Sequence, residues 1–265
     1  MNNIYVSHNN IISSLGFTSE TVVENIQNEI SGLKHINDQT MLSDPFYTSL
    51  VPTEKLHLEF NKLNPNKDYT RLEQIMITSL SKIITSSKID LTKRVGLIIS
   101  TTKGNIDALD KNNPFDEKRA YLSELGKVIS SFFNFKNDAL IVSNACVSGI
   151  LSVAIAKRYI NEGVYDHVFI VSGDVITKFI LSGFNSFQAL STEPCKPYDA
   201  NRNGFSDLDL DQDGLLSDQN GYNVDADGDG CIMPEVDSDS ICIGLPALVA
   251  ETITVLRFCL GCTRC

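Results

Sequence analysis

Residues 142–150, Val-Ser-Asn-Ala-Cys-Val-Ser-Gly-Ile, are the stretch around which the fold of this chain is organised. They join a short apolar run, Ala139–Val142, to a stretch with helical periodicity, Val147–Asn161. Apolar runs without alternation are typical of strands covered on both faces, as in a parallel sheet. The sequence therefore predicts a strand, a turn that holds Cys146, and a helix. That helix is apolar on most sides, so we expect it to be central and buried.

Further apolar runs and helical stretches alternate along the first 205 residues. The expected strands are Val95–Ile99, His167–Val171 and, more weakly, Ile4–Val6; the expected helices are Ser19–Ile30, Arg71–Ser86 and Asp116–Phe133. Gly163 suits the end of the helix after Cys146, because glycine accepts the left-handed conformation common there. Asn37–Asn66, rich in Pro, Asp and Thr, is expected to be an irregular insertion. Strands alternating with helices predict an α/β layered fold.

The charge of the chain is concentrated in one segment. The net charge is −11, from 33 acidic and 22 basic residues. Ser206–Ser240 holds eleven acids and no Lys or Arg, so the remainder has 22 acids and is formally neutral. A neutral body argues against nucleic-acid binding, which requires a basic surface. We therefore expect three segments: an α/β domain over 1–205, an acidic Asp-rich segment over 206–240 and a Cys-containing segment over 241–265.

The cellular location follows from what the chain lacks. The N-terminus, MNNIYVSHNN, has no basic and apolar signal pattern, so no secretory signal is expected. The most apolar late stretch, Ile241–Leu260, contains Pro246, Glu251 and Arg257, which argue against a membrane span. We expect a cytoplasmic protein.

Cys146 is the candidate nucleophile. Catalytic sites of α/β folds gather where strands end and helices begin. The free N–H groups and positive dipole of a helix N-terminus favour the thiolate, which is the reactive form of cysteine. Small neighbours (Ala145, Ser148 and Gly149) would let a substrate carbonyl approach. The alternative is that Cys146 is a small buried hydrophobic residue, as most cysteines outside disulfides are.

Four ordered segments resemble the β-ketoacyl-acyl-carrier-protein synthase family. They are Asn144–Gly149 (Asn-Ala-Cys-Val-Ser-Gly), His167–Asp174, Gly183-Phe184 to Ala189-Leu190-Ser191, and Lys196–Phe205; Ile11–Lys34 is similar to the family's opening. Four matches in order make a specific signal, although each alone would be weak. The resemblance implies the N-terminal half of a thiolase-like layered fold. In it a mixed, mainly parallel sheet carries helices on both faces and is followed here by an irregular acidic tail.

The resemblance also implies an activity and partners. Cys146 would accept an acyl chain as a thioester and condense it with a malonyl unit, in fatty-acid or polyketide-type synthesis. The partner would be an acyl carrier protein bearing acyl or malonyl thioesters. The protein would form a homodimer, or a heterodimer with a synthase subunit, through the edge at Ala139–Ser143. No cofactor is required. A non-catalytic partner subunit is the alternative, although such subunits usually replace the cysteine.

The chain departs from the family after Phe205. The family's second half, which supplies two histidines or a His and an Asn, is missing. The histidines here (His8, His35, His57 and His167) lie in no family motif. Where the family continues into another core strand, this sequence has Ser-Asp-Leu-Asp-Leu-Asp-Gln-Asp-Gly. We therefore expect incomplete condensation activity, and a truncated or frame-disrupted product is an alternative.

The acidic segment predicts a calcium site. Two Asp-x-Asp-x-Asp-Gly motifs begin 16 residues apart and supply Asp209, Asp211, Asp213, Asp225, Asp227 and Asp229 as candidate ligands. Carboxylates alternating before a turn glycine bring hard oxygen ligands together for Ca²⁺. The segment resembles the aspartate-rich calcium repeats of extracellular proteins; a solvated acidic segment is the alternative. Cys259, Cys262 and Cys265 are three further candidate metal ligands, without a fourth partner.

Overall fold

The computed structural model describes residues 4–186, 190 and 251–260 of the chain. The chain divides into two compact units. The first consists of Met1–Ser31, Val51–Val175 and Glu251–Cys265, and the second of Gly32–Leu50 and Ile176–Ala250. Cys146 belongs to the first unit. Among the described helices, none combines the length and apolar character needed to cross a bilayer.

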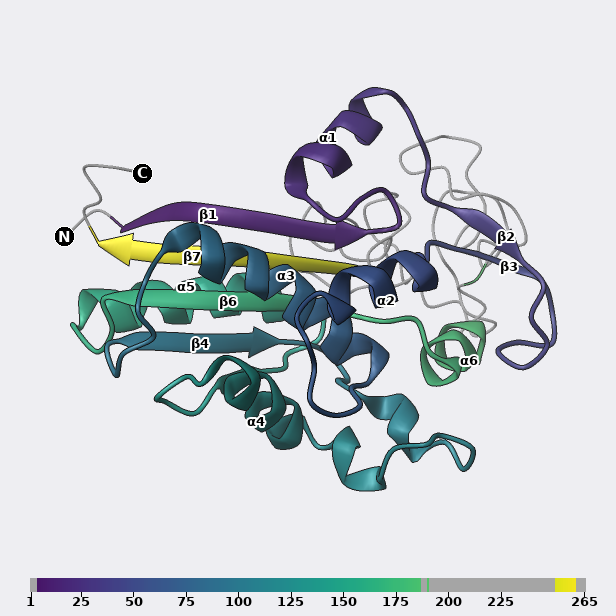
Figure 1. Ribbon diagram of the computed structural model, residues 1–265. Coiled ribbons are helices and arrows are strands. Elements are labelled where there is room, and N and C mark those ends of the chain that lie inside the picture. Colours follow the sequence, from purple (N-terminus) through teal and green to yellow (C-terminus); the bar gives the residue numbers. More distant parts are fainter. Residues whose placement is uncertain (1–3, 187–189, 191–250, 261–265) are drawn as a thin grey trace, which may run out of the picture. The chain divides into compact units, whose positions relative to one another are not determined.

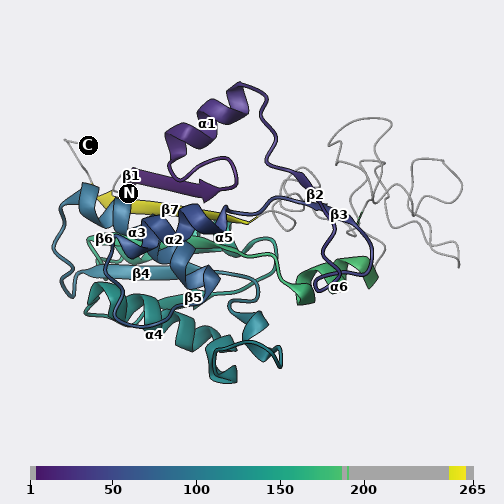
Figure 2. The same cartoon turned by 45° about the vertical axis from the view of Figure 1, so that its right-hand side comes forward.

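The first unit is built on a five-stranded sheet in the order β1-β7-β6-β4-β5 (Figure 1). The strands are β1 (Ile4–Ser13), β4 (Val95–Ser100), β5 (Leu140–Val142), β6 (His167–Asp174) and β7 (Thr252–Leu260). β4 pairs in parallel with β5 and β6, whereas β7 pairs antiparallel with β6 and β1. Figure 2 brings β5 into view at the edge of the sheet, next to β4. The expected mixed α/β sheet is confirmed.

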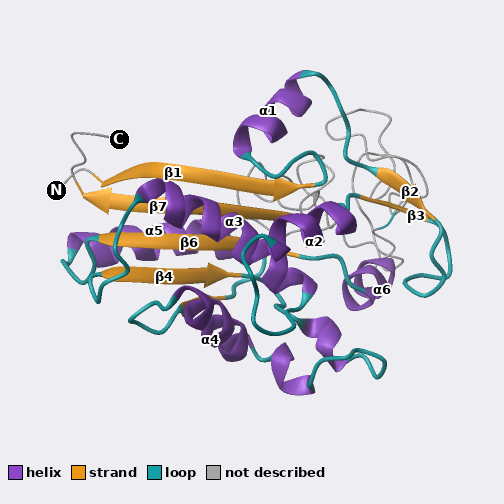
Figure 3. Ribbon diagram, viewed as in Figure 1, coloured by secondary structure: helices purple, strands orange, loops and turns teal. Residues whose placement is uncertain are grey.

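Helices cover both faces of this sheet (Figure 3). The helices of the first unit are α1 (Ser19–Gln27), α2 (Thr53–Asn61), α3 (Arg71–Ser87), α4 (Leu122–Phe133) and α5 (Ser148–Asn161), with short 3₁₀ turns η1 (Ile106–Leu109) and η2 (Glu117–Ala120). One hydrophobic cluster joins α2, α3 and α4 to one face, and a second joins α5 to the other. A capping box formed by Thr70 and Glu73 begins α3, satisfying two of the N–H groups that a helix N-terminus leaves unpaired.

The apolar run in β4 is explained by this layering. Leu97 and Ile99 belong to the cluster beneath α3 and α4, whereas Ile98 belongs to the cluster beneath α5. All six residues of the strand are buried. Burying each large apolar side chain is worth about 1.5–3 kcal/mol, so Val95–Ile99, between two helical layers, shows no alternation with polar residues.

The prediction that the helix after Cys146 is buried on most sides is wrong for this chain. α5 buries a single stripe made of Ser148, Ser152, Ala156 and Ile160, at intervals of four residues. These mostly small side chains let the helix lie close to the sheet. Ile150, on another side of the helix, is 76% exposed. No element of the described part of the chain covers that side, so its apolar residues face outward. The glycine at the helix end is confirmed: Gly163 has φ +70°.

The prediction that Asn37–Asn66 is irregular is also wrong. The range contains β3 (Phe46–Thr48), in the second unit, and α2, in the first. The α2 residues Leu56 and Phe60, four positions apart, are both buried, so α2 follows the helical period despite its polar surroundings. In the second unit β3 pairs antiparallel with β2 (Lys34–Ile36), and α6 (Lys178–Ser186) contributes Leu181 to a small core with Phe46 and Ile176.

The sequence did not predict β7. This strand lies between β1 and β6, and Ile253 and Val255 are fully buried in the cluster shared with α3. The expected boundaries at 205/206 and 240/241 stay predictions, but residues 252–260 are part of the sheet that the first 175 residues build. By resemblance, a further core strand is expected after Phe205, and β7 occupies an interior position in the sheet, next to the edge strand β1.

Candidate active site

Cys146 lies in the turn between β5 and α5, the position that the sequence predicts. Ser100 of β4 is in register with Val142 of β5 and with Ser172 of β6, so these three parallel strands end at one edge of the sheet. The turn leaves the sheet at that edge, where ligand sites of open α/β sheets are found. The thiol of Cys146 is free and the residue is exposed. This excludes the alternative that it is a buried hydrophobic residue in this chain.

A serine on the helix side holds the turn. The backbone N–H of Asn144 donates to Ser148 Oγ at 2.8 Å, and Ser148 Oγ donates to the carbonyl of Ala145 at 2.7 Å. Ala145 has φ +43°, a left-handed conformation that costs a non-glycine residue about 1–3 kcal/mol and persists where the surroundings hold it. From the sequence, Ser148 is expected only as a small neighbour of the thiol. Its position two residues after Cys146, at the start of a helix, was the available signal.

The thiol stands beside an uncapped helix N-terminus. The N-cap residue of α5, Val147, makes no side-chain capping hydrogen bond. The first N–H groups of a helix carry partial positive charge and bind anions when they are not capped by a side chain. A Cβ added at Gly149 would meet no described atom within 4 Å. The turn therefore offers a thiol, backbone donors and open space for a carbonyl group.

The histidines lie elsewhere. His167 begins β6, at the opposite end of the parallel strands from the turn of Cys146. His8 lies on β1, in register with Arg257 of β7. Burial, together with the Arg257 charge, lowers the pKa of both His8 and His167. His35 belongs to β2, in the second unit, and His57 to α2. None of the four lies in the turn that holds Cys146.

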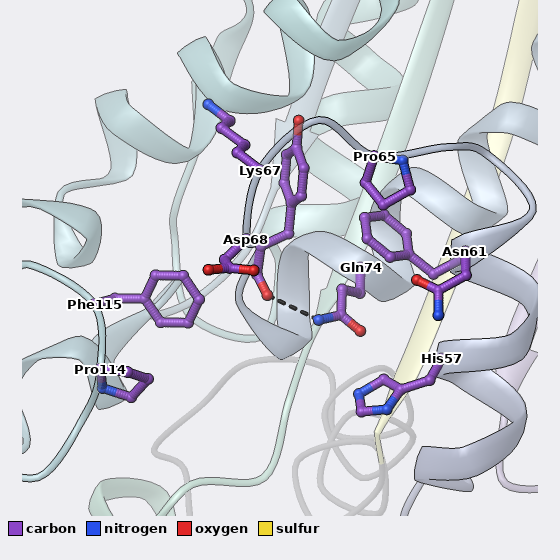
Figure 4. A pocket seen from close by; sticks show the side chains of 10 residues that line it. His57, Asn61, Pro65, Lys67, Asp68, Gln74, Pro114 and Phe115 are labelled. Atoms are coloured by element: carbon purple, nitrogen blue, oxygen red, sulfur yellow. Dashed lines mark hydrogen bonds between the residues drawn. The ribbon is translucent and has the colours of Figure 1, made fainter.

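His57 lines a separate cavity of about 490 Å³ with mixed polar and apolar walls (Figure 4). Its walls are His57, Phe60, Asn61, Pro65, Lys67, Asp68, Tyr69, Gln74, Pro114 and Phe115. Figure 4 shows Gln74 between His57 and Asn61 on one side and Phe115 on the other. Gln74 Nε2 donates to the Tyr69 carbonyl at 2.8 Å. The lining does not include Cys146 or its neighbours, so the cavity is distinct from the turn.

All but one of the predicted metal ligands lie outside the described residues, so their role stays a prediction. Asp209, Asp211, Asp213, Asp225, Asp227 and Asp229 lie outside the described residues, as do Cys262 and Cys265. Cys259 is fully buried in β7, so it fits the core better than a metal site. Among residues 4–186, 190 and 251–260, no group of three or more His, Cys, Asp or Glu side chains is arranged to hold a metal ion.

Known proteins share both the sequence features and the fold. Residues 12–207 match the model of the family "Beta-ketoacyl synthase, N-terminal domain". The chain is 22% identical over 231 residues to 3-oxoacyl-[acyl-carrier-protein] synthase 1 of Buchnera aphidicola subsp. Schizaphis graminum, covering 77% of this chain and 56% of that protein. The chain thus spans little more than half the length of this relative.

Solved ketosynthases have the same fold. A chain of the complex between the ketosynthase ApeO and its chain length factor ApeC from Xenorhabdus doucetiae matches with a TM-score of 0.65 at 14% identity, over 98% of this chain and 58% of that one. The ketosynthase from module 6 of the bacillaene synthase of Bacillus subtilis 168 matches with a TM-score of 0.64 at 13% identity. The match covers 97% of this chain and 40% of that one. The family match covers most of the chain, including the turn of Cys146. The chain therefore belongs to the β-ketoacyl synthase family, of which it carries the N-terminal domain.

Proposed function

We propose that this chain supplies the acyl-accepting part of a condensing enzyme. Cys146 takes an acyl group from a carrier-protein thioester, and the acyl unit is then joined to a malonyl unit in fatty-acid or polyketide-type synthesis. The observation that carries the proposal is the exposed thiol of Cys146 beside the uncapped N-terminus of α5. We expect this acyl transfer to take place in the cytoplasm.

The acyl transfer needs only groups at this turn. The Cys146 thiolate attacks the carbonyl carbon of the carrier thioester, forming a new C–S bond. The bond from that carbon to the carrier sulfur breaks, and the carrier thiol leaves with the proton that Cys146 gave up. Backbone N–H groups at the start of α5 are the donors for the oxyanion that forms between these two events. Condensation needs further residues, which by resemblance come from a second half beyond this chain.

The proposal includes a second synthase-type subunit as partner. The similar ApeO structure is a ketosynthase in complex with a chain length factor. The order of the strands places β5 at an edge of the sheet, directly before the nucleophile turn, and we propose this edge as the dimer contact. A purely non-catalytic role is less favoured, because the thiol is retained and exposed. Co-purification with a full-length synthase would identify such a partner, and a monomer that binds none would contradict this arrangement.

The nucleophile is tested by mass spectrometry of the acylated protein. The full chain is incubated with an acyl-carrier-protein thioester, and in parallel with a cerulenin-like electrophile. Trypsin releases residues 137–157, a peptide in which Cys146 is the only cysteine. We expect the acyl mass on this peptide and its loss in Cys146→Ala. Cys195→Ala, which removes the other thiol of the family-matched region, serves as the control and should leave labelling unchanged. Acyl transfer to other cysteines, or undiminished labelling of Cys146→Ala, would contradict the assignment.

A further inference from the structure

The carboxylate of Asp174 organises the loop that follows β4. Asp174 is the last residue of β6 and is half-buried. It accepts hydrogen bonds from Thr101 Oγ1 at 2.6 Å, Thr102 N at 2.9 Å, Thr102 Oγ1 at 3.0 Å and Lys103 N at 3.2 Å. An ionised carboxylate is an acceptor with two oxygens and about four lone-pair sites. One side chain therefore receives four donors from three successive residues.

The same loop contacts the strand that leads to Cys146. The backbone N–H of Thr101 donates to the carbonyl of Val142 at 3.2 Å. The hydroxyl of Ser143 donates to the carbonyl of Thr102 at 3.1 Å. Thr102 thus bonds Asp174 through its N–H and hydroxyl, and Ser143 through its carbonyl. One residue, Thr102, therefore connects Asp174 at the end of β6 to Ser143, three residues before the thiol.

We infer that Asp174 is a positioning residue for Cys146, acting through Thr102 and Ser143; this inference rests on the proposed role of Cys146 as nucleophile. The turn of Cys146 needs support from both sides, because Ala145 is held at φ +43°. Ser148 supports it from the helix. Asp174 supports it from the strand, by holding the loop to which Ser143 is bonded. On the strand side, the contact is made by Ser143, whose hydroxyl donates to the Thr102 carbonyl.

The charge of Asp174 matters for this role. An asparagine at this position keeps the size of the side chain but offers one acceptor oxygen, and its amide group would face N–H and O–H donors. In either orientation the amide group meets a backbone N–H in place of an acceptor: the N–H of Thr102 where Oδ2 now accepts it, or the N–H of Lys103 where Oδ1 now accepts it. We expect the loop to shift, the bond to Ser143 to weaken and the thiol to lose its orientation. A structural role alone would lower stability without changing the thiol's reactivity in the folded protein.

The test measures the reactivity of the thiol without using the synthase reaction. The rate constant for alkylation of Cys146 by iodoacetamide is followed from pH 6 to pH 10 on the tryptic peptide 137–157, beside the thermal midpoint of each variant. Asp174→Asn is compared with Asp166→Asn. The control removes the same charge just before the other end of β6, where Asp166 pairs with Arg94 at the surface. We expect Asp174→Asn to slow alkylation about tenfold and change its pH profile, because a thiol displaced from the N–H groups at the start of α5 loses part of their stabilisation of the thiolate, while Asp166→Asn matches the wild type.

A second variant tests the route of the effect. Ser143→Ala removes only the hydrogen bond to the Thr102 carbonyl. If Asp174→Asn does not fold, Ser143→Ala still tests the connection by itself. We expect a smaller loss in the same direction, and no further loss when Ser143→Ala is added to Asp174→Asn, because the two changes break one connection. Alkylation of Asp174→Asn at the wild-type rate and pH profile, fully additive losses in the double variant, or a wild-type rate in Ser143→Ala would each overturn the inference. A wild-type chain that is alkylated at Cys146 but not acylated by a carrier thioester would instead contradict the proposed function.

Discussion

Arg71 and Glu251, 180 residues apart in the chain, form a two-contact ion pair in the first unit. Arg71 Nε lies 2.8 Å from Glu251 Oε1, and Arg71 Nη2 lies 2.6 Å from Oε2. Glu251 is 1% exposed and also accepts the backbone N–H of Val51 at 2.8 Å. Arg71 begins α3, and Glu251 directly precedes β7. The pair therefore sets the point at which the last strand enters the sheet.

Glu251→Gln is expected to lower the free energy of unfolding by about 3 kcal/mol. The change keeps the shape of the side chain but leaves the Arg71 guanidinium without a counter-ion, and breaking a buried pair from one side is costly. Urea unfolding measures the loss. The control is Glu59→Gln, whose partner Lys62 is 60% exposed, with an expected loss of at most about 1 kcal/mol. Similar small losses in both variants would show that Glu251 does not anchor β7.

Ile253→Ala tests whether residues 252–260 belong to the fold. Ile253 is fully buried between α3 and the sheet, so its truncation is expected to cost about 2–5 kcal/mol in unfolding free energy. The matched control is Ile150→Ala, the same change at a residue that is 76% exposed, with an effect within about 0.5 kcal/mol. Chemical unfolding of both variants decides the matter. If both variants lose equally little unfolding free energy, residues 252–260 do not contribute to the core of the domain.

Stability is expected to fall as the pH falls from about 7 to 5, partly through His167. Burial, with a smaller contribution from Arg257, lowers the pKa of His167 below its ordinary value of 6.5. Its Nδ1 is buried and has no hydrogen-bond partner among the described residues. As the pH falls, the unfolded chain therefore takes up the proton first, and the folded state is penalised. Above pH 7 both states hold neutral imidazole and the effect vanishes.

His167→Gln should make the free energy of unfolding less dependent on pH in that window. Unfolding by urea at pH 7.5, 6.5, 5.5 and 5.0 measures the dependence. The control is His57→Gln, because His57 is exposed on α2, and it should keep the wild-type profile. A profile of His167→Gln as steep as that of the wild type would show that other groups cause the acid sensitivity.

The acidic segment is expected to bind Ca²⁺. Calorimetric titration of the full chain should give a Ca²⁺ heat, protection of residues 206–240 from protease, and a stability that rises with Ca²⁺ concentration. Mg²⁺ should substitute poorly, because it demands a stricter octahedron and keeps its waters. Replacing Asp209, Asp211 and Asp213 by Asn should remove part of the heat, whereas replacing Asp237 and Asp239, which lie outside the two motifs, should not. If Ca²⁺ gives no binding heat and millimolar Ca²⁺ does not protect residues 206–240 from protease, the alternative of a solvated acidic segment is the better interpretation.

The sequence by itself determined most of the sheet strands, most of the helices and the turn of Cys146 in the first 175 residues, because each of these depends on a local pattern. Apolar runs mark β4, β5 and β6, which are covered on both faces. The helical period in Arg71–Ser87 and the small residues around Cys146 are likewise local. The family follows from the order of such motifs. α2 was missed because the polar residues around Leu56 and Phe60 concealed their four-residue spacing.

Only the tertiary structure decided which distant segments meet. β7 lies between β1 and β6 because Ile253 and Val255 fill the core beneath α3 and Glu251 binds Arg71, and no local pattern encodes those partners. The exposed side of α5 was decided in the same way, since burial depends on what covers a helix as well as on its own apolar residues. The bonds of Asp174 to the loop at Thr102, 72 residues away, exist because β4 and β6 are neighbours in the sheet. Hydrophobic periodicity specifies elements, whereas sheet order and buried ion pairs specify contacts between residues far apart in the chain.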